Sequence, residues 1–113
     1  MARSLILIRN CMGLCTRIEC EIRPLEGGRD LWTLLCAAGM ADAQPSAIKA
    51  QGPFHGASVA EGLLASVTDS LALQGYEQSS EQPIWRLHLQ AELRRLNHER
   101  CQHLADFRCR PDP

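Results

Sequence analysis

The segment "NHERCQHLADFRC" near the end of the chain gathers the residue types that most often bind transition metals: His98, Cys101, His103 and Cys109. Zinc requires four ligands that converge tetrahedrally. On a helix His98 and Cys101 share a face, whereas His103 is rotated by about 140° from His98. A further pair, Cys11 and Cys15, lies at the opposite end of the sequence. The pattern therefore favours a polar helix face over a metal site.

Motifs for nucleophilic or cofactor-dependent catalysis are absent from the sequence. The segment "GASVA" lacks the second glycine of a nucleophile elbow, and no Cys-x-x-Cys pair is present. His55 lies in a segment rich in Pro and Gly, where a single histidine is more often a turn residue than a catalytic base. No glycine-rich phosphate loop occurs. We therefore expect a non-enzymatic protein that uses no cofactor and no metal.

The six cysteines and the N-terminal sequence indicate the compartment. The apolar run Leu5–Ile8 is interrupted by Arg9, so it is too short for a secretory signal or a membrane span. Disulfides are rare in reducing compartments. We expect a cytoplasmic protein with reduced thiols.

Charge is distributed unevenly along the chain, although the net charge is only −1. Residues 37–85 hold one lysine and five acidic residues, whereas residues 86–113 hold six arginines and four acidic residues. A phosphate-binding surface usually needs a stronger basic stripe. A solvated helix face is the favoured interpretation. The alternative is a small DNA- or metal-responsive protein that uses the basic, His- and Cys-containing last helix.

Hydrophobic periodicity predicts a mainly α fold, a single domain over residues 1–113 with about three main helices. The first predicted helix covers residues 29–42, where Leu31, Leu34, Leu35 and Ala38 follow the i, i+3, i+4, i+7 spacing. The second covers 57–74 and ends at Gly75. The third covers 82–107, with Glu92–Arg95 and Arg95–Glu99 spaced as surface ion pairs. Residues 44–56 are predicted to be a connection, with one helical turn near Ser46–Ala50 as the alternative.

The N-terminal region shows weaker signals. Residues 1–12 lack a helix cap or a clear period, which predicts a poorly ordered extension. In "TRIECEIRP", Ile18, Cys20 and Ile22 alternate with charged residues, the pattern of a short, half-buried strand. Over so few residues a helix is the open alternative.

One row of the second predicted helix carries very small side chains: Ser58, Gly62, Ser66 and Ser70. Such a row lets another backbone approach closely. An exposed row would more naturally hold Glu, Lys, Gln or Arg. We therefore predict close helix packing along this row, within the chain or across a homodimer, with contact to another protein and a chance pattern as alternatives. Trp32 and Phe54 are the expected apolar anchors of a protein interface.

The segments "GPFHGASVAEGLLASVTDSLALQGY" and "EQPIWRLHLQAELRRLN" give the chain a resemblance to the QslA-like quorum-sensing anti-activators of pseudomonads. The resemblance covers most of the chain from about residue 27. It implies a helical dimer that binds the ligand-binding domain of a LuxR-type transcription activator. That binding would block dimerisation of the activator and its attachment to DNA, without direct contact between this protein and nucleic acid or membrane.

Overall fold

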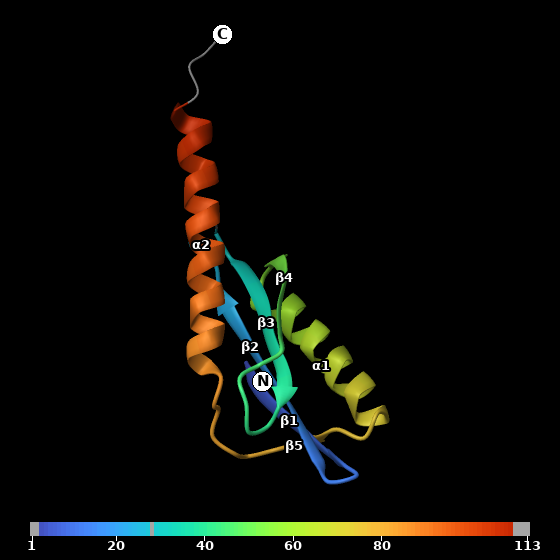
Figure 1. Ribbon diagram of the computed structural model, residues 1–113. Helices are drawn as coiled ribbons and strands as arrows, with labels where there is room; N and C mark the ends of the chain where they lie inside the picture. Colours follow the sequence, from blue (N-terminus) through green and yellow to red (C-terminus); the bar gives the residue numbers. More distant parts are fainter. Residues whose placement is uncertain (1–2, 28, 110–113) are drawn as a thin grey trace.

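A five-stranded antiparallel sheet lies between two helices in the computed structural model, which describes residues 3–27 and 29–109, with side chains as far as Arg100. The strands are β1 (Ser4–Cys11), β2 (Leu14–Pro24), β3 (Leu31–Met40), β4 (Ala47–His55) and β5 (Glu77–Gln78). The helices are α1 (Ala57–Leu73) and α2 (Arg86–Cys109). Figure 1 shows α2 and α1 on either side of the sheet.

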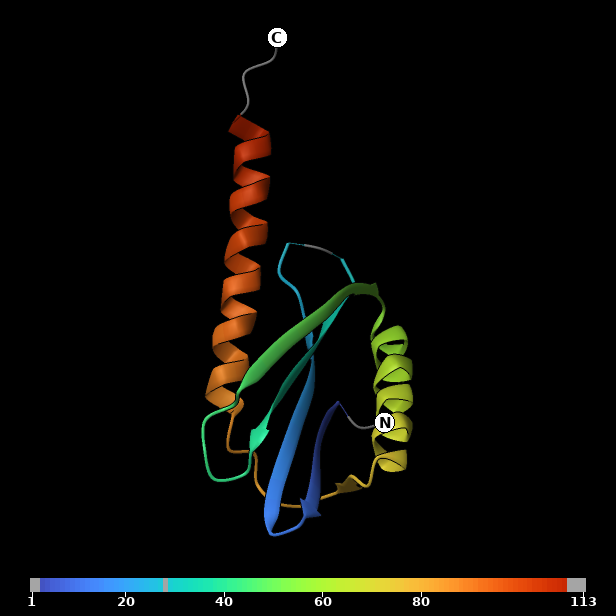
Figure 2. The ribbon, with the colours of Figure 1, turned by 45° about the vertical axis from the view of Figure 1, so that its right-hand side comes forward.

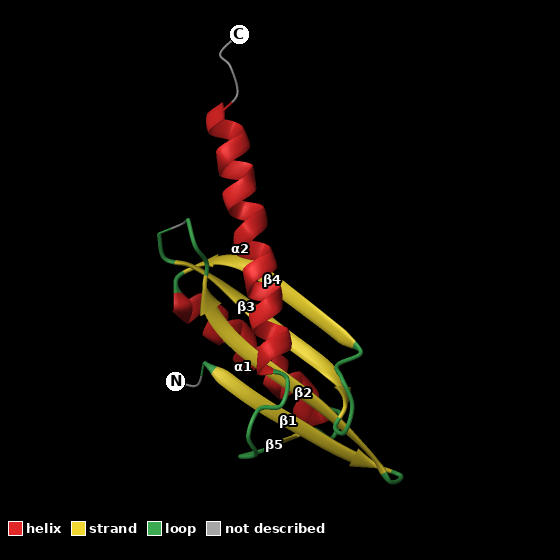
Figure 3. Ribbon diagram, turned by 60° about the vertical axis from the view of Figure 1, so that its left-hand side comes forward, coloured by secondary structure: helices red, strands yellow, loops and turns green. Residues whose placement is uncertain are grey.

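The first four strands form a meander, and the order across the sheet is β4-β3-β2-β1-β5. β1 and β2 are joined by the two-residue turn Met12–Gly13, in which both residues have positive φ, 52° and 82°. Such turns match the twist of the strands that they join. After β4, α1 carries the chain back across the sheet, so that β5 can pair with β1 at the opposite edge (Figure 3).

The two faces of the sheet bury separate cores, because successive side chains of a strand point in opposite directions. The α1-side core contains Cys20, Ile22, Leu34, Ala60 and Leu64. The α2-side core contains Leu35, Ala37, Trp85 and Leu89. Leu34 and Leu35 are both fully buried although they are adjacent in β3. The result is a three-layer α/β/α arrangement, seen edge-on in Figure 2.

The predicted mainly α, all-helical fold is wrong, because the sheet is the largest part of the structure. The first predicted helix, over residues 29–42, is instead β3. A central strand that is covered on both faces reads as a nearly continuous apolar run, and such a run satisfies helical and strand periods equally. The spacing of Leu31, Leu34, Leu35 and Ala38 is a consequence of burial on both faces.

The sheet also overturns the predictions for the N-terminal residues and for the segment before α1. Residues 4–11 are not an extension but the strand β1, which pairs with β2 along its whole length, while residues 1–2 lie outside the described chain. The predicted connection over 44–56, with its turn near Ser46–Ala50, is instead mostly β4, whose register with β3 shifts between Trp32 and Leu34. The predicted strand in "TRIECEIRP" is confirmed as part of β2.

The second and third predicted helices are confirmed as α1 and α2, although α2 begins at Arg86 rather than near residue 82. Arg95 pairs with Glu92 and with Glu99, as their spacing predicts. The hydrogen bond to Glu92, followed by the charges of Glu92 and Glu99, raises the pKa of the Arg95 guanidinium above its ordinary value. Among the helices of the described chain, none has both the length and the apolar character that a membrane crossing needs.

α2 is longer than the sheet that it covers. Leu93 and Leu96 pack against the α2-side core, and Asn97 accepts a hydrogen bond from the Glu26 N–H at 2.9 Å. The Arg100 guanidinium donates to the Glu26 carbonyl at 3.2 Å. Beyond Arg100 the helix continues to Cys109, about 13 Å at 1.5 Å per residue, and points away from the sheet (Figures 1 and 2).

Two leucines of α2 provide a direct test of how this helix is seated. Leu89 is fully buried in the α2-side core, whereas the Leu87 side chain is 75% exposed. Leu89→Ala should lower the free energy of unfolding by about 2–5 kcal/mol, because it leaves a cavity between helix and sheet. Leu87→Ala should change that free energy by less than about 0.5 kcal/mol. Urea unfolding of the two variants measures both values, and equal losses would contradict this seating of α2.

Candidate functional site

The most buried charges of the described chain belong to Arg17 and Glu19, which lie on the face of β2 that is turned towards α2. Each side chain is only 3% exposed, and the Arg17 Nε donates to the Glu19 Oε2 at 2.7 Å. Burial of either charge alone would cost several kcal/mol. The pair is therefore stable only as a pair, and only while further hydrogen bonds satisfy its remaining atoms.

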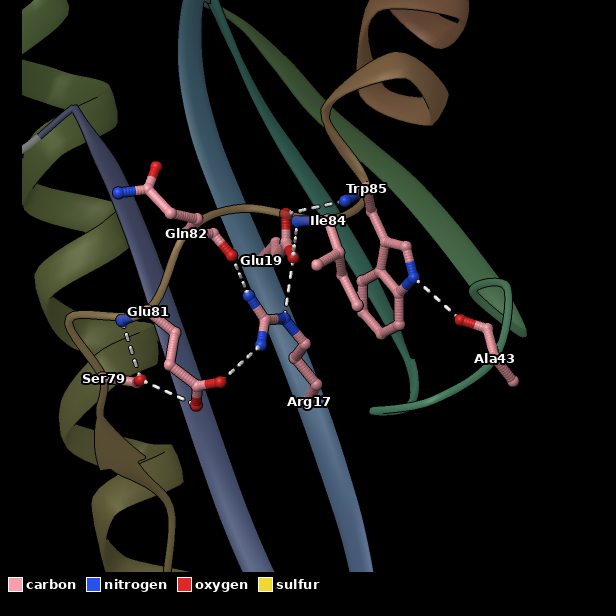
Figure 4. Close-up of polar contacts among 8 residues, drawn as sticks. All are labelled: Arg17, Glu19, Ala43, Ser79, Glu81, Gln82, Ile84 and Trp85. Carbon is pink, nitrogen blue, oxygen red and sulfur yellow. Dashed lines mark hydrogen bonds and ion pairs between the residues drawn. The ribbon is translucent and has the colours of Figure 1, made fainter.

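Glu19 also holds the start of α2. Its carboxylate accepts the Ile84 N–H at 2.8 Å and the Trp85 N–H at 3.2 Å, immediately before the first helical residue (Figure 4). The first N–H groups of a helix have no partner within the helix, and its N-terminus favours negative charge. α2 begins with Arg86, Leu87 and His88 and so brings no acid of its own to this position. Glu19 of β2 supplies the charge.

Arg17 and Trp85 attach the rest of the segment that leads into α2. The Arg17 Nη2 donates to the Gln82 carbonyl at 2.6 Å, and its Nη1 lies 3.7 Å from the Glu81 carboxylate. The Trp85 indole N–H donates to the Ala43 carbonyl at 3.0 Å. Figure 4 shows the contacts of Arg17 and Glu19 between β2 and the segment 79–85, and the contact from Trp85 to Ala43 on the other side of that segment. We call the Arg17–Glu19 pair and the segment 79–85 together the latch. Both carboxylate oxygens of Glu19 accept hydrogen bonds from backbone N–H groups. The latch therefore holds the start of α2 on the sheet, and the Glu19 carboxylate is fully engaged in doing so.

The residues considered for metal binding or catalysis are not brought together. Among the side chains that the structure describes, no three His, Cys, Asp or Glu groups are placed to hold a metal ion. His55 and His98 are exposed at separate positions, at the end of β4 and on α2. Cys101, His103 and Cys109 lie outside the described side chains. Cys11 and Cys15 flank the β1–β2 turn.

A groove of about 340 Å³ lies between α2 and the edge strand β4. Its lining is partly apolar and partly polar: Leu25, Thr33, Ala50, Gln51, Gly52, Pro53, Leu96, Glu99 and Arg100. β4 has no strand on its outer side in the described chain. This α2–β4 groove lies where α2 begins to leave the sheet.

A second exposed surface lies at the end of the sheet where β1, β2 and β3 meet. Met12 is 97% exposed, Leu14 is 60% exposed and Met40 is 36% exposed. Met40 pairs with Thr16, and Leu14 lies two residues before Thr16 on the same face of β2. We call these three residues the hairpin patch. This patch was not predicted from the sequence, although Gly13 between two apolar segments was a signal for a two-residue hairpin turn.

The predicted interface anchors Trp32 and Phe54 are brought together, but on the inside of the structure. They are register partners on β3 and β4 and pack, half-buried, against the α1-side core. The Trp32 indole N–H donates to Asp30 at 3.0 Å, and the Arg3 guanidinium lies 4.8 Å from the centroid of the Trp32 ring. Their role in a protein interface stays a prediction.

The small-residue row lies on an exposed side of α1. Ser58, Gly62, Ser66 and Ser70 are all exposed. A Cβ atom built on Gly62 would meet no atom of the described chain within 4 Å. Within the described chain this row therefore does not pack closely against another element. Close contact of the row with a second molecule stays a prediction.

The comparisons with known proteins define a family. A sequence model for the PA4575-like protein family matches residues 1–113, and the chain belongs to that family. No curated protein and no solved structure matches the chain.

The latch can be tested by removing one charge of its buried pair. Glu19→Gln should lower the free energy of unfolding by about 3–5 kcal/mol, because the Arg17 charge stays buried without its counter-charge. Glu81→Gln is the matched control, since the Glu81 side chain is 62% exposed and lies 3.7 Å from the same guanidinium. Its loss should not exceed about 1 kcal/mol. Equal losses for the two variants in urea unfolding would show that burial does not set the strength of the latch.

Gly62 provides a test of the small-residue row. Gly62→Ala should raise the free energy of unfolding by up to about 1 kcal/mol, because alanine has the higher helix propensity and the position has space for a methyl group. Thermal unfolding at low protein concentration measures this effect on the single chain. A loss of stability would instead mean that another backbone occupies the space beside Gly62.

Proposed function

We propose that this member of the PA4575-like family is a non-enzymatic regulator that acts by binding another protein through the hairpin patch. The observation that carries the proposal is the position of Met12. Its side chain is 97% exposed, and its φ is 52°. A non-glycine residue in this left-handed region costs roughly 1–2 kcal/mol. Met12 thus weakens the fold and buries almost nothing within the described chain.

A partner protein that covers Met12 would explain why an exposed methionine occupies this strained position. Turns of this type favour Asn and Gly, which would serve the hairpin better than methionine. Methionine is flexible and polarisable, and it is used at surfaces that adapt to another protein. Leu14 and Met40 extend the apolar area beside it. Departures from local sequence preference of this kind concentrate at functional sites.

The partner class that we propose is a LuxR-type transcription activator, bound in the cytoplasm through its ligand-binding domain. Support for this class comes from the resemblance of residues 52–76 and 81–97 to QslA-like anti-activators. The helical fold that the resemblance implied is wrong, so this support is confined to the sequence. Such activators place two DNA-reading helices on adjacent half-sites by dimerising. A protein that covers the dimer surface of the activator would prevent that spacing without touching DNA.

We also propose that the regulator is a homodimer, joined through the α2–β4 groove. The chain carries both halves of such an interface: a groove of about 340 Å³ beside an edge strand, and a helix that runs on past Arg100 without a layer of the sheet beneath it. A two-fold axis would place the end of each α2 against the groove of the other copy, so that each chain gives and receives the same contact. The β1–β2 turn lies at the other end of the sheet (Figure 1), so this arrangement would leave the hairpin patch uncovered.

The homodimer can be tested with two Ala→Arg variants. Ala50 lines the α2–β4 groove, whereas Ala91 is exposed on α2 and does not line it. We expect the wild-type protein to sediment as a dimer, Ala50→Arg to weaken dimerisation at least tenfold, and Ala91→Arg to leave it unchanged. Sedimentation equilibrium gives the dissociation constants. A monomeric wild-type protein, or equal constants for the two variants, would contradict this interface.

The anti-activator function can be tested with two Leu→Lys variants. Leu14 belongs to the hairpin patch and is 60% exposed, and Leu87 is a still more exposed leucine on α2, at 75%. In a DNA mobility shift with purified activator and its autoinducer, wild-type protein and Leu87→Lys should remove the activator–DNA complex. That removal should saturate at a fixed molar ratio. Leu14→Lys should lose at least tenfold in potency.

The outcomes of this experiment separate the partner class from the surface. If excess wild-type protein leaves the complexes of all LuxR-type activators of the source organism intact, the partner class is wrong. If wild-type protein inhibits and both lysine variants inhibit equally well, the hairpin patch is not the binding surface.

A further inference from the structure

Cys20 of β2 and Cys36 of β3 are direct register partners beneath α1. Their Sγ atoms lie 3.2 Å apart and share a hydrogen bond. Both belong to the region where α1 packs on the sheet, since Cys20 is part of the α1-side core and Cys36 packs against it. The structure thus holds two free thiols in contact, at the centre of the sheet and outside the hairpin patch and the groove.

The backbone at this pair has the geometry that a disulfide needs. At one end of the β2–β3 ladder the Leu25 N–H donates to the Leu31 carbonyl, and at the other the Ala41 N–H donates to the Cys15 carbonyl. Hydrogen-bonded and non-hydrogen-bonded pairs alternate along such a ladder. The Leu25–Leu31 and Cys15–Ala41 pairs are hydrogen-bonded, and the Cys20–Cys36 pair lies five positions from each of them. Cys20 and Cys36 therefore form a non-hydrogen-bonded pair.

Opposed residues in a non-hydrogen-bonded pair have Cα atoms about 4.5 Å apart. A disulfide spans Cα separations of about 4.4–6.8 Å. The two thiols can therefore be joined by rotation of their side chains, with no change in strand register.

The two cysteines differ in access and acidity. Cys20 is 1% exposed, whereas Cys36 is half-buried and can meet a small solute. The hydrogen bond with Cys20 lowers the pKa of the Cys36 thiol, because a shared proton stabilises its thiolate. The same hydrogen bond, followed by burial, raises the pKa of the Cys20 thiol. The thiolate is the form that reacts with oxidants. Cys36 is therefore the first thiol to react, and Cys20 is the one that completes the reaction.

We propose that Cys20 and Cys36 are an oxidative modification site, which hydrogen peroxide converts into a reversible cross-strand disulfide. This proposal rests on the β2–β3 pairing and is independent of the proposed regulatory function.

The reaction consumes one peroxide for each disulfide. The Cys36 thiolate attacks one peroxide oxygen, the O–O bond breaks, and Cys36 becomes a sulfenic acid as hydroxide leaves and takes up a proton to form water. The Cys20 sulfur then attacks the Cys36 sulfur, the S–O bond breaks, and a second water leaves with the Cys20 proton. The two thiols lose two electrons in total, and the peroxide gains them. A dithiol reductant reverses the change by thiol–disulfide exchange.

The described cysteines outside this pair are placed differently. Cys11 is exposed at the end of β1 and pairs in register with Leu14, whereas Cys15 is opposite Asn10. Neither has a thiol as its register partner. Selectivity among these four cysteines would follow from the strand pairing, so a peroxide-treated chain should form one defined internal disulfide.

The test treats the native, full-length protein with a small excess of hydrogen peroxide, followed by denaturation, alkylation and peptide mass spectrometry. Of the six thiols per chain, two should be lost. The mapped disulfide should join Cys20 to Cys36, and dithiothreitol should restore both thiols. A different disulfide, a disulfide between chains, or a Cys36 thiol that resists peroxide would overturn the proposal.

Two alanine variants sharpen the assignment. In folded Cys20→Ala, Cys36 should react more slowly than in the wild type, because it has lost the hydrogen bond with Cys20. Once formed, its sulfenic acid should persist and be trapped by dimedone, because no second thiol resolves it. Cys15→Ala is the matched control on the same strand and should form the Cys20–Cys36 disulfide at the wild-type rate. Loss of that disulfide in Cys15→Ala would contradict the pairing. Should Cys20→Ala fail to fold, the disulfide map of the native chain decides the question by itself.

Discussion

The position of α2 depends on the Arg17–Glu19 pair, two opposite charges that folding removes almost wholly from water. Each charge would be costly to bury alone, and together they still need donors and acceptors for their other atoms. The segment 82–85 supplies these through the Gln82 carbonyl and the N–H groups of Ile84 and Trp85. The backbone groups before α2 thus hydrogen-bond to the two buried charges, and the Glu19 carboxylate in turn accepts the N–H groups that have no partner within the helix. From this point α2 crosses the sheet, forms one wall of the groove and continues beyond it.

Burial of both faces of the sheet explains why parts of the fold could not be predicted from sequence. In β3, Leu34 and Leu35 point to opposite cores, so the strand lacks the alternation that identifies a half-exposed strand. Its apolar residues then match a helical spacing equally well. β2 was predicted as a strand because its charged side chains, which include Arg17 and Glu19, preserve the alternation. Those side chains signalled a solvated face, yet the structure buries them beneath the start of α2.

The parts predicted correctly are those governed by local sequence: α1 with Gly75 beyond its end, and α2 with the ion pairs around Arg95. Contacts between residues that are far apart in the sequence left no local pattern from which they could be predicted. Glu19 meets Ile84 and Trp85 across 65 and 66 residues. The hairpin patch joins the β1–β2 turn to residues of β2 and β3, and only the sheet shows that Leu14 and Met40 share a face. The contact between Cys20 and Cys36 likewise exists only because β2 and β3 pair in this register.

The two helices of the chain pack on opposite faces of the sheet, and the surfaces that we propose for binding other proteins lie at its end and its edge. The proposed function requires that a partner covers the hairpin patch. Hydrogen–deuterium exchange of the protein, measured alone and with an excess of its activator, tests this requirement. We expect exchange to slow in a peptide spanning residues 11–14 and in one spanning 40–43, while the exposed outer side of α2 near Leu87 is unchanged. Unchanged exchange at both ends of the patch, with protection elsewhere, would contradict it.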